Sequence, residues 1–554
     1  MTEPLPVIAR KRPLAVLLLL CVIAWLPGFF TLPPLDRDES RFAQATKQML
    51  ESGDFVNINF GGAPRYEKPV GIYWLQSLST AVLGAGSRDR IWTYRVPSLL
   101  GAMAAVAATF FIARAFAGAE TAFFAGLILG LSVLLMSEAK IAKTDAVLLG
   151  AVATAQAVIM RTYLGARVPG GPALPGKPAL ILGWMAFGIG VLVKGPLIAL
   201  VCLASIAAIV IWDREWRWLG ALRPLTGLGV VLLMVLPWAV AIGIASHGLF
   251  YQKSLGQDFA MKLMGDQESH GAPPGYYTLL APAIFWPGIL VLLPAIVYGI
   301  GQRKDPAIRY LLAWAATTWL MFEFAPTKLP HYVLPAFPAL SVLCALWICS
   351  SIRDSKAVRI GQWVSAALFV GVGLALAGFL AWAPSRFGTG TPWWLYAASG
   401  LCGLAVIAVV PPILARRRRE AVLAAGLSAI MLYAVAGFAT VPRLDALWLS
   451  PRLAEAVQRQ ARAGDPPVTT AGYAEPSIAF LLGTGTALDD GLTAAHAVGN
   501  AGGLALVSDD QQTSFLRELA KDGARADRLE EIDGFNYSRG KPAKITLYRV
   551  APLH

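Results

Sequence analysis

The chain has 554 residues, of which 56% are hydrophobic, and a formal net charge of +13. Several apolar stretches reach about 18 residues, the length at which a helix crosses a bilayer, which excludes an ordinary soluble globular protein. The five cysteines all lie in apolar stretches, so neither a disulfide framework nor a thiolate metal site is indicated. The basic excess indicates membrane topology and contact with anionic membrane lipids; no nucleic-acid binding is expected.

Hydropathy predicts an α-helical polytopic membrane protein with about thirteen transmembrane helices and additional juxtamembrane helices. The expected spans are residues 14–32, 93–116, 120–136, 145–163, 179–194, 197–212, 226–246, 277–300, 308–325, 333–350, 360–383, 394–414 and 420–440. The first stretch has no small-residue cleavage site, so we expect it to be retained as a span and not removed as a signal peptide.

Loops rich in lysine and arginine indicate which side of the membrane each end occupies. Basic residues at 10–12 precede the first span, and the run 416–419 follows the twelfth. These loops place the N-terminus in the cytoplasm, and an odd number of spans then places the C-terminus outside. The outer face receives the segments 33–92, 140–145, 247–276 and 328–332, together with Lys194. Because these charged segments come from distant parts of the chain, we expect an active site on this face.

The tail, residues 441–554, differs in composition from the rest of the chain. It has 12 lysines and arginines against 14 acidic residues, so the positive charge resides in residues 1–440. Apolar patterns at 467–472, 503–509 and 544–550 predict strands, the first two followed by helical patterns. We therefore expect a transmembrane catalytic domain over 1–440, with outer loops 33–92 and 247–276, and a small α/β domain over 441–554.

A charged cluster follows the first expected span, after a double proline. The sequence DRDESR contains Asp36, Asp38, Glu39 and Arg41. Asp36 or Asp38 is expected to cap a helix that runs to about residue 50 and lies in the membrane interface. The alternative is a capped amphipathic helix whose acids only complement its dipole.

A second cluster, Arg65-Tyr66-Glu67-Lys68-Pro69, precedes a run too short to span and expected to form another interfacial helix. Tyr73 and its neighbour Trp74 suit the level of the lipid head groups. The alternative is a set of long charged side chains that reach toward water at the membrane border.

Lysines at the outer ends of spans run against the positive-inside bias. They occur in Lys143-Thr144-Asp145, Lys194-Gly195-Pro196 and Lys328-Leu329-Pro330-His331-Tyr332. A lysine beside hydrocarbon needs a counter-charge, and a lipid phosphate could supply it. Ion pairs with Glu67, Asp145 or Glu323 are the alternative.

A divalent metal is a weaker expectation. His270, in the outer loop 247–276, could bind an ion such as zinc together with Glu67, although two ligands from distant segments form a weak pattern. No cofactor is otherwise expected to be required.

Taken in order, these motifs resemble bacterial glycosyltransferases related to the protein O-mannosyltransferases, which have the GT-C membrane fold. The motifs that carry the resemblance are Asp38-Glu39-Ser40-Arg41-Phe42, Glu67-Lys68-Pro69, Tyr73-Trp74-Leu75, Thr144-Asp145-Ala146, Lys194-Gly195-Pro196 and the stretch 328–335. The likeness is strongest over 1–340 and closest to the lipid A 4-amino-4-deoxy-L-arabinose transferases. The second acid of DRDES, and Glu-Lys-Pro where many relatives have Lys-Pro-Pro, depart from the family pattern.

The resemblance implies a bacterial inner-membrane enzyme whose active site and C-terminal domain are periplasmic. It would move 4-amino-4-deoxy-L-arabinose from undecaprenyl phosphate to a lipid A phosphate, which gives resistance to polymyxin and other cationic peptides. The implied catalytic residues are Asp38, Glu39 and Asp145. The implied ligands of the carrier phosphate are Arg41, Lys68, Lys194, Lys328 and Tyr332. Substrate contacts are expected from Tyr66, Tyr73 and His331.

The chemistry of a glycosyl phosphate agrees with these roles. Its bond breaks through an oxocarbenium-like state, so cations on the departing phosphate stabilise developing negative charge. A carboxylate such as Asp38 can stabilise positive charge on the sugar or orient the acceptor. A phosphate acceptor is largely ionised at neutral pH and needs little general base, whereas a hydroxyl acceptor would need one.

Two alternatives remain open at this point. A sibling enzyme would move another sugar or act on another lipid or on protein serine and threonine. A lipid flippase or transporter would place ionisable residues at mid-bilayer, often in repeated halves, whereas here the charges gather at one interface and no repeat is visible.

Overall fold

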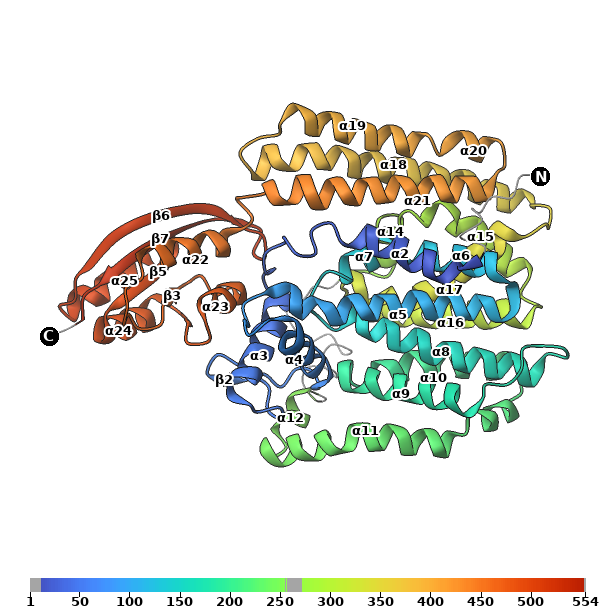
Figure 1. The fold of residues 1–554 in the computed structure, drawn as a ribbon, viewed down its shortest axis with the longest axis horizontal. Coiled ribbons are helices and arrows are strands. Elements are labelled where there is room, and N and C mark those ends of the chain that lie inside the picture. Colours follow the sequence, from blue (N-terminus) through green and yellow to red (C-terminus); the bar gives the residue numbers. More distant parts are fainter. Residues whose placement is uncertain (1–10, 255, 257–271, 553–554) are drawn as a thin grey trace.

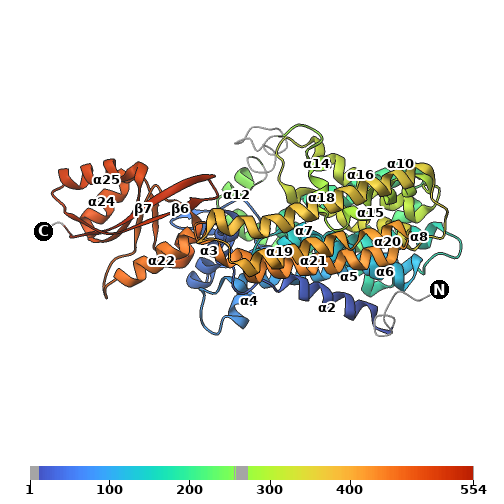
Figure 2. The same ribbon diagram turned by 90° about the horizontal axis from the view of Figure 1, so that it is seen from above.

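The structure is a computed structural model that describes residues 11–254, 256 and 272–552. Long helices run side by side along one direction, and a smaller domain with a sheet projects from one end of this bundle (Figures 1 and 2). The predicted architecture, a helical polytopic membrane protein with a separate C-terminal domain, is confirmed at this level.

Eight helical segments within the described residues are long and apolar enough to cross a membrane. They are α5 (Ile91–Ala117), α8 (Asp145–Arg167), α9 (Lys177–Lys194), α11 (Pro224–Ala245), η3 with α17 (Pro330–Cys349), α18 (Lys356–Phe387), α19 with α20 (Trp393–Leu414) and α21 with its extension (Arg418–Arg443). Shorter apolar helices are α2 (Pro13–Trp25), α6 (Ala119–Gly130), α10 (Leu197–Asp213) and α15 (Ile289–Gly301). The bundle also contains α16 (Pro306–Phe324).

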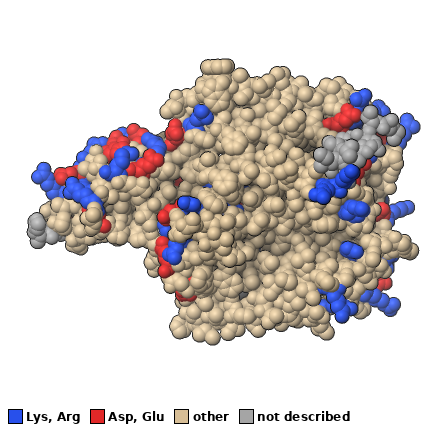
Figure 3. All heavy atoms as spheres, viewed as in Figure 1, with Lys and Arg blue, Asp and Glu red and all other residues tan. Residues whose placement is uncertain are grey.

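Charge on the surface follows the direction of the bundle. On the face shown in Figure 3, lysines and arginines gather at the end opposite the C-terminal domain, and a broad band with few charged atoms covers the helices. Charges return at the base of the C-terminal domain. An uncharged band between two charged rims is the surface that a bilayer requires.

Several of the expected spans are interrupted, and two of the breaks lie against each other. Residues 120–136 form α6 and the separate helix α7 (Val133–Glu138), and residues 277–300 form α14 (Tyr276–Ile284) and α15. Pro287 lies in the second break and cannot donate a helical hydrogen bond. The two breaks bond each other, because the Val133 N–H donates to the Trp286 carbonyl at 2.8 Å. Hydropathy did not detect these breaks, since their residues remain apolar.

The helices α5 and α8 pack closely, which matters because they carry charged residues at the same end. A Cβ atom on Gly101 would lie 2.6 Å from Cα of Val147, and one on Gly150 would lie 2.6 Å from the Gly101 carbonyl oxygen. Glycine at these positions therefore allows the two backbones to approach.

The two predicted interfacial helices are α3 (Asp38–Ser52) and α4 (Gly71–Leu83), joined through the short hairpin β1 (Asn59–Phe60) and β2 (Ala63–Pro64). They lie where the bundle meets the C-terminal domain (Figure 1). The predicted cap of α3 was wrong: Arg37 occupies the cap position and no side chain accepts a capping hydrogen bond. The Asp36 carboxylate instead accepts a hydrogen bond from Ser477.

The C-terminal domain contains a five-stranded mixed sheet in the order β4-β3-β5-β7-β6. Its strands are β3 (Thr469–Ala471), β4 (Ala487–Asp489), β5 (Gly503–Ser508), β6 (Ala526–Asn536) and β7 (Lys541–Val550). Its helices are α22 (Leu449–Gln460), α23 (Pro476–Leu482), α24 (Gly491–Ala501) and α25 (Asp509–Lys521). β3 is parallel to β4 and β5, whereas β7 is antiparallel to β5 and β6. The three predicted strands are present. The edge strands β4 and β6 were missed, since one is short and the other is mostly exposed.

Candidate active site

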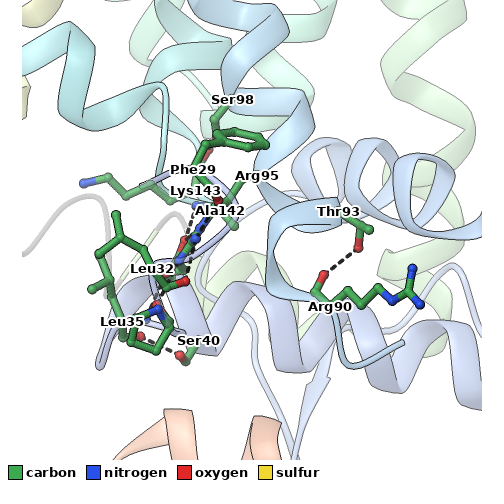
Figure 4. Close-up of polar contacts among 12 residues, drawn as sticks. Phe29, Leu32, Leu35, Ser40, Arg90, Thr93, Arg95, Ser98, Ala142 and Lys143 are labelled. Carbon is green, nitrogen blue, oxygen red and sulfur yellow. Dashed lines mark hydrogen bonds and ion pairs between the residues drawn. The ribbon is translucent and has the colours of Figure 1, made fainter. Parts of the chain in front are cut away.

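Arg95, in the second turn of α5, is fully buried and forms a hub of hydrogen bonds near the start of that helix (Figure 4). Its Nε and Nη2 atoms donate to the two carboxylate oxygens of Glu39 at 2.8 and 2.9 Å. Its remaining donors bond the backbone carbonyls of Phe29, Leu32 and Pro33. All five guanidinium N–H groups are therefore used.

Glu39 is equally saturated. Besides Arg95, its carboxylate accepts the backbone N–H groups of Leu35 and Ala142, each at 2.9 Å, and its side chain is 0% exposed. A carboxylate with all its lone pairs engaged and no exposed surface cannot contact a substrate without breaking the hub. Glu39 therefore ties the segment after the first span to α5 and to the loop before α8, and its catalytic role stays a prediction.

Asp38 differs from its neighbour because its side chain is exposed at the first turn of α3. Arg41, one turn further along, is half-buried, and its guanidinium forms no hydrogen bond or ion pair with any residue that the structure describes. A carboxylate and an unpaired guanidinium on one helical turn can bind a sugar and a phosphate together.

Five charged or titratable side chains form a buried cluster behind this turn: Glu138, Lys143, Asp145, Lys194 and His331. The Lys194 ammonium lies 2.5 Å from one Asp145 oxygen, and the Lys143 ammonium lies 2.9 Å from Glu138 and 3.6 Å from Asp145. The His331 imidazole completes the cluster, with Nε2 3.7 Å from Asp145 and Nδ1 3.3 Å from the Lys143 ammonium. The structure thus brings together residues from α7, α8, α9 and η3 (Pro330–Ala336).

Glu138 was not predicted as a site residue. It is buried at the end of α7, and its second carboxylate oxygen finds no hydrogen-bond partner among the described residues. An acid that ends an apolar stretch is a signal that sequence inspection could have used, as is Arg95 within an apolar span.

Lys143 connects the cluster to Asp38. Burial disfavours its ammonium, but the carboxylates of Glu138 and Asp145, and that of Asp38 at longer range, outweigh burial and raise its pKa. The backbone also joins the two regions, because the N–H of Ala142, the residue before Lys143, donates to the carboxylate of Glu39, the residue after Asp38.

Tyr73 of α4 faces the same region. It is fully buried, packs against Phe42 of α3 with ring centroids 5.5 Å apart, and its hydroxyl has no hydrogen-bond partner among the described residues. Burial raises its pKa to about 12; Arg65 opposes this shift, whereas Glu67 and Asp38 add to it. A buried hydroxyl within reach of these charges is suited to a polar ligand.

The remaining residues of the second cluster, 65–68, lie in the same region. Arg65 pairs with Glu67 at 3.0 Å and lies over the Phe42 ring, and the Tyr66 ring packs against Phe250. Lys68 is half-buried beside them. The predicted metal ligand Glu67 therefore already has a cationic partner, and His270 lies outside the described residues.

Lys328 is buried and its ammonium donates to the carbonyls of Glu323 and Ala325 at 2.9 and 2.6 Å, at the end of α16. These contacts are those of a helix C-cap, and the role of Lys328 as a phosphate ligand stays a prediction. The Glu323 carboxylate in turn accepts the N–H groups of Gly275 and Tyr277 at the start of α14, so it does not pair with Lys328. Tyr332 lies under the Lys194 ammonium, 5.4 Å from the ring centre.

Comparison with known proteins shows which glycosyltransferases the chain resembles. Residues 16–248 match the family described as dolichyl-phosphate-mannose-protein mannosyltransferase. The undecaprenyl phosphate-alpha-4-amino-4-deoxy-L-arabinose arabinosyl transferase of Edwardsiella ictaluri is 32% identical over 384 residues, and that of Aeromonas hydrophila is 30% identical over 376 residues. The chain is therefore similar to the protein mannosyltransferase family of membrane glycosyltransferases. The resemblance predicted from the motifs is thereby confirmed.

The alignments cover 68% and 65% of this chain and 66% and 65% of the two relatives, so the chain spans just under two thirds of the relatives' length. The fold extends further. The crystal structure of ArnT from Cupriavidus metallidurans bound to undecaprenyl phosphate superposes with a TM-score of 0.76, over 97% of this chain and 98% of that chain, at 17% identity. The chain therefore shares the whole fold of that protein, C-terminal domain included.

Proposed function

We propose that this protein is a pentosyltransferase that moves 4-amino-4-deoxy-L-arabinose from undecaprenyl phosphate to a phosphate of lipid A. The observation that carries the proposal is the site at one rim of the bundle, where Asp38 and Arg41 lie exposed or half-buried in front of a buried cluster of two acids, two lysines and a histidine. The names of the relatives at about a third identity supply the sugar and the carrier.

The finer topology forms part of the proposal. The eight long apolar segments, the four shorter apolar helices and α16 would provide the spans, with the N-terminus in the cytoplasm of a bacterial inner membrane. The active site and the C-terminal domain would then be periplasmic, and α3 and α4 would lie in the outer interface.

Roles follow from the bonding state of each residue. Arg41 and Lys68 would hold the carrier phosphate and stabilise the negative charge that develops on it. Asp38 would orient the acceptor phosphate and balance the positive charge on the sugar. The Tyr73 hydroxyl would donate to a sugar or phosphate oxygen. The cluster around Asp145 would fix the electrostatic potential behind them, with Lys194 held against Asp145 at 2.5 Å.

An apolar groove would take the polyprenyl tail of the carrier. The groove has a volume of about 630 Å³ and lies between α10, α14, α15, α16 and α17, with Thr278 and Ala281 at its α14 side. The Tyr277 hydroxyl, one residue before Thr278 on α14, donates to the Leu329 carbonyl at 3.1 Å, so α14 contributes both to the groove and to the contacts of the Lys328–Tyr332 segment. Its lining is almost entirely hydrocarbon, which suits an isoprenoid chain.

The test is mass spectrometry of lipid A from cells with and without the protein. A pentosamine-sized increment that requires the protein is expected, and Asp38→Asn should abolish it because the acceptor loses its orienting charge. The matched control is Glu420→Gln, which removes an exposed acid at the opposite end of the bundle and should retain the increment. An increment of another mass would replace the aminosugar by that of a sibling enzyme. Unchanged lipid A would overturn the proposed acceptor.

A further inference from the structure

The turn that precedes α3 has an unusual backbone. Arg37, at the cap position between Asp36 and Asp38, has φ 63° and ψ −116°. A residue with a side chain rarely adopts a positive φ, and it persists there only when surrounding contacts enforce it. Because Asp38 is the next residue, this turn sets where the Asp38 carboxylate lies.

The contacts that hold the turn come from the C-terminal domain. The Asp36 N–H donates to the Tyr537 hydroxyl at 2.6 Å, and the Ser477 hydroxyl donates to the Asp36 carboxylate. The Arg37 guanidinium donates to the Ser538 carbonyl. Tyr537 and Ser538 lie in the loop between β6 and β7, and Ser477 lies on α23. Two elements of the C-terminal domain therefore bond the turn before α3.

The residues that bond the turn before α3 are themselves held by hydrogen bonds within the C-terminal domain. The Ser450 hydroxyl bonds both Tyr473, at 2.7 Å, and Ser477, at 2.6 Å. The Glu475 carboxylate accepts from Asn536 at 2.9 Å and from Ser538. A bonded network of this kind inside the domain gives these residues little freedom to move.

The C-terminal domain also packs along α3 beyond the turn. Phe480 of α23 is fully buried against Ala43, Ile91, Tyr94 and Ala142. The Lys47 ammonium of α3 donates to the Phe480 carbonyl at 3.2 Å. Ala142 immediately precedes Lys143 of the buried cluster, so this contact reaches the catalytic region from a second side.

On the other side of Asp38, Glu39 is locked to Arg95. Asp38 therefore lies between two fixed points, one in the membrane domain and one in the C-terminal domain. We propose that the C-terminal domain sets the position of Asp38, with Tyr537 and Ser477 acting as positioning residues for the transfer reaction. The inference rests on the proposed function only in that Asp38 takes part in transfer.

The test compares Tyr537→Phe with Tyr548→Phe in the full-length protein. Tyr548 is a buried residue on β7 of the same domain. Its hydroxyl bonds Gln512 and not the turn before α3. Both variants lose one hydroxyl, but only Tyr537→Phe removes the acceptor of the Asp36 N–H. We expect Tyr537→Phe to lower kcat roughly tenfold to a hundredfold, the cost of an ångström-scale misplacement, with KM for the carrier unchanged. Ser477→Ala should act in the same direction, and Tyr548→Phe should leave kcat at the wild-type value.

A fourth variant, Arg37→Gly, separates positioning from general destabilisation. Arg37→Gly can adopt the positive φ without strain. If the contacts serve to enforce that conformation, adding Arg37→Gly to Tyr537→Phe recovers part of the lost kcat. Wild-type kcat in both Tyr537→Phe and Ser477→Ala would overturn the inference, as would an equal loss in Tyr548→Phe.

Hydrogen–deuterium exchange gives a readout that does not depend on the reaction. The N–H groups of Ser40 and Arg41 bond the carbonyls of Leu35 and Arg37 across the turn. Their exchange should accelerate in Tyr537→Phe and not in Tyr548→Phe. If lipid A is unchanged by the protein but these amides respond, the proposed function fails while the positioning stands; unchanged exchange overturns the positioning.

Discussion

The hub around Arg95 and the cluster around Asp145 both pair buried acids with cations at the same end of the bundle, yet they differ in how fully their polar atoms are bonded. Every donor of Arg95 and every lone pair of Glu39 has a partner. In the other cluster a Glu138 oxygen lacks a partner within the described residues, and several charges meet at 3.3 to 3.7 Å. The comparison teaches that a saturated buried charge supports the architecture, whereas an incompletely bonded one is available for chemistry.

The largest expected effect is on stability, from Glu39→Gln. Breaking a buried ion pair leaves the Arg95 charge uncompensated, which costs about 3–5 kcal/mol. We expect a clear fall in the unfolding midpoint of the detergent-solubilised protein, with little folded protein recovered. Asp38→Asn is the control, since the neighbouring acid is exposed and its loss should leave the midpoint unchanged. A stable Glu39→Gln variant that lost only activity would assign Glu39 to the catalytic residues.

The next effect is on the rate, from Asp145→Asn. This change removes the negative charge that pairs with the Lys194 ammonium and so alters the electrostatic potential of the site. We expect kcat to fall by about two to three orders of magnitude. Glu138 remains to balance the lysines, so the unfolding midpoint should fall less than in Glu39→Gln. Single-turnover transfer from a polyprenyl phosphosugar measures the rate. A normal rate would show that the cluster only supports the fold.

A pair of cation variants sharpens the same contrast. Lys328→Met should cost about 1–3 kcal/mol, because buried carbonyls of α16 lose their donor, and should leave carrier affinity unchanged. Arg41→Gln should leave stability unchanged and weaken carrier binding about tenfold, the equivalent of one charge-assisted hydrogen bond. Titration with undecaprenyl phosphate measures the affinity. If Lys328→Met weakened carrier binding and Arg41→Gln did not, Lys328 would be the phosphate ligand.

The smallest effect is a pH dependence at the contact between the two domains. Burial, and the nearby Glu475 carboxylate, raise the pKa of Asp36 to about 6, although Ser477, Tyr537 and Arg37 favour its charged form. Because the folded pKa lies above the ordinary value of 3.8, the contribution of this carboxyl is fully present below that value and is lost as the pH rises through 6.

Hydrogen–deuterium exchange of the turn before α3, corrected for the intrinsic effect of pH, should therefore show more protection near pH 5 than near pH 7.5. Asp36→Asn should abolish the difference. Equal protection at both values in the wild-type protein would contradict the assignment.

The sequence alone determined the membrane class, the existence of helices α3 and α4, the separate tail domain and the motifs that carry the family resemblance, because hydropathy and local charge express these features residue by residue. It could not show that Glu39 is buried and Asp38 exposed, that Lys328 caps a helix, or that Glu138 belongs to the buried cluster. Nor could it predict the hydrogen bond between Asp36 and Tyr537, which are 501 positions apart. Only the tertiary structure decided these points. Burial and hydrogen-bond partners determine what a charged group can do, and those partners come from segments that meet only when the chain has folded.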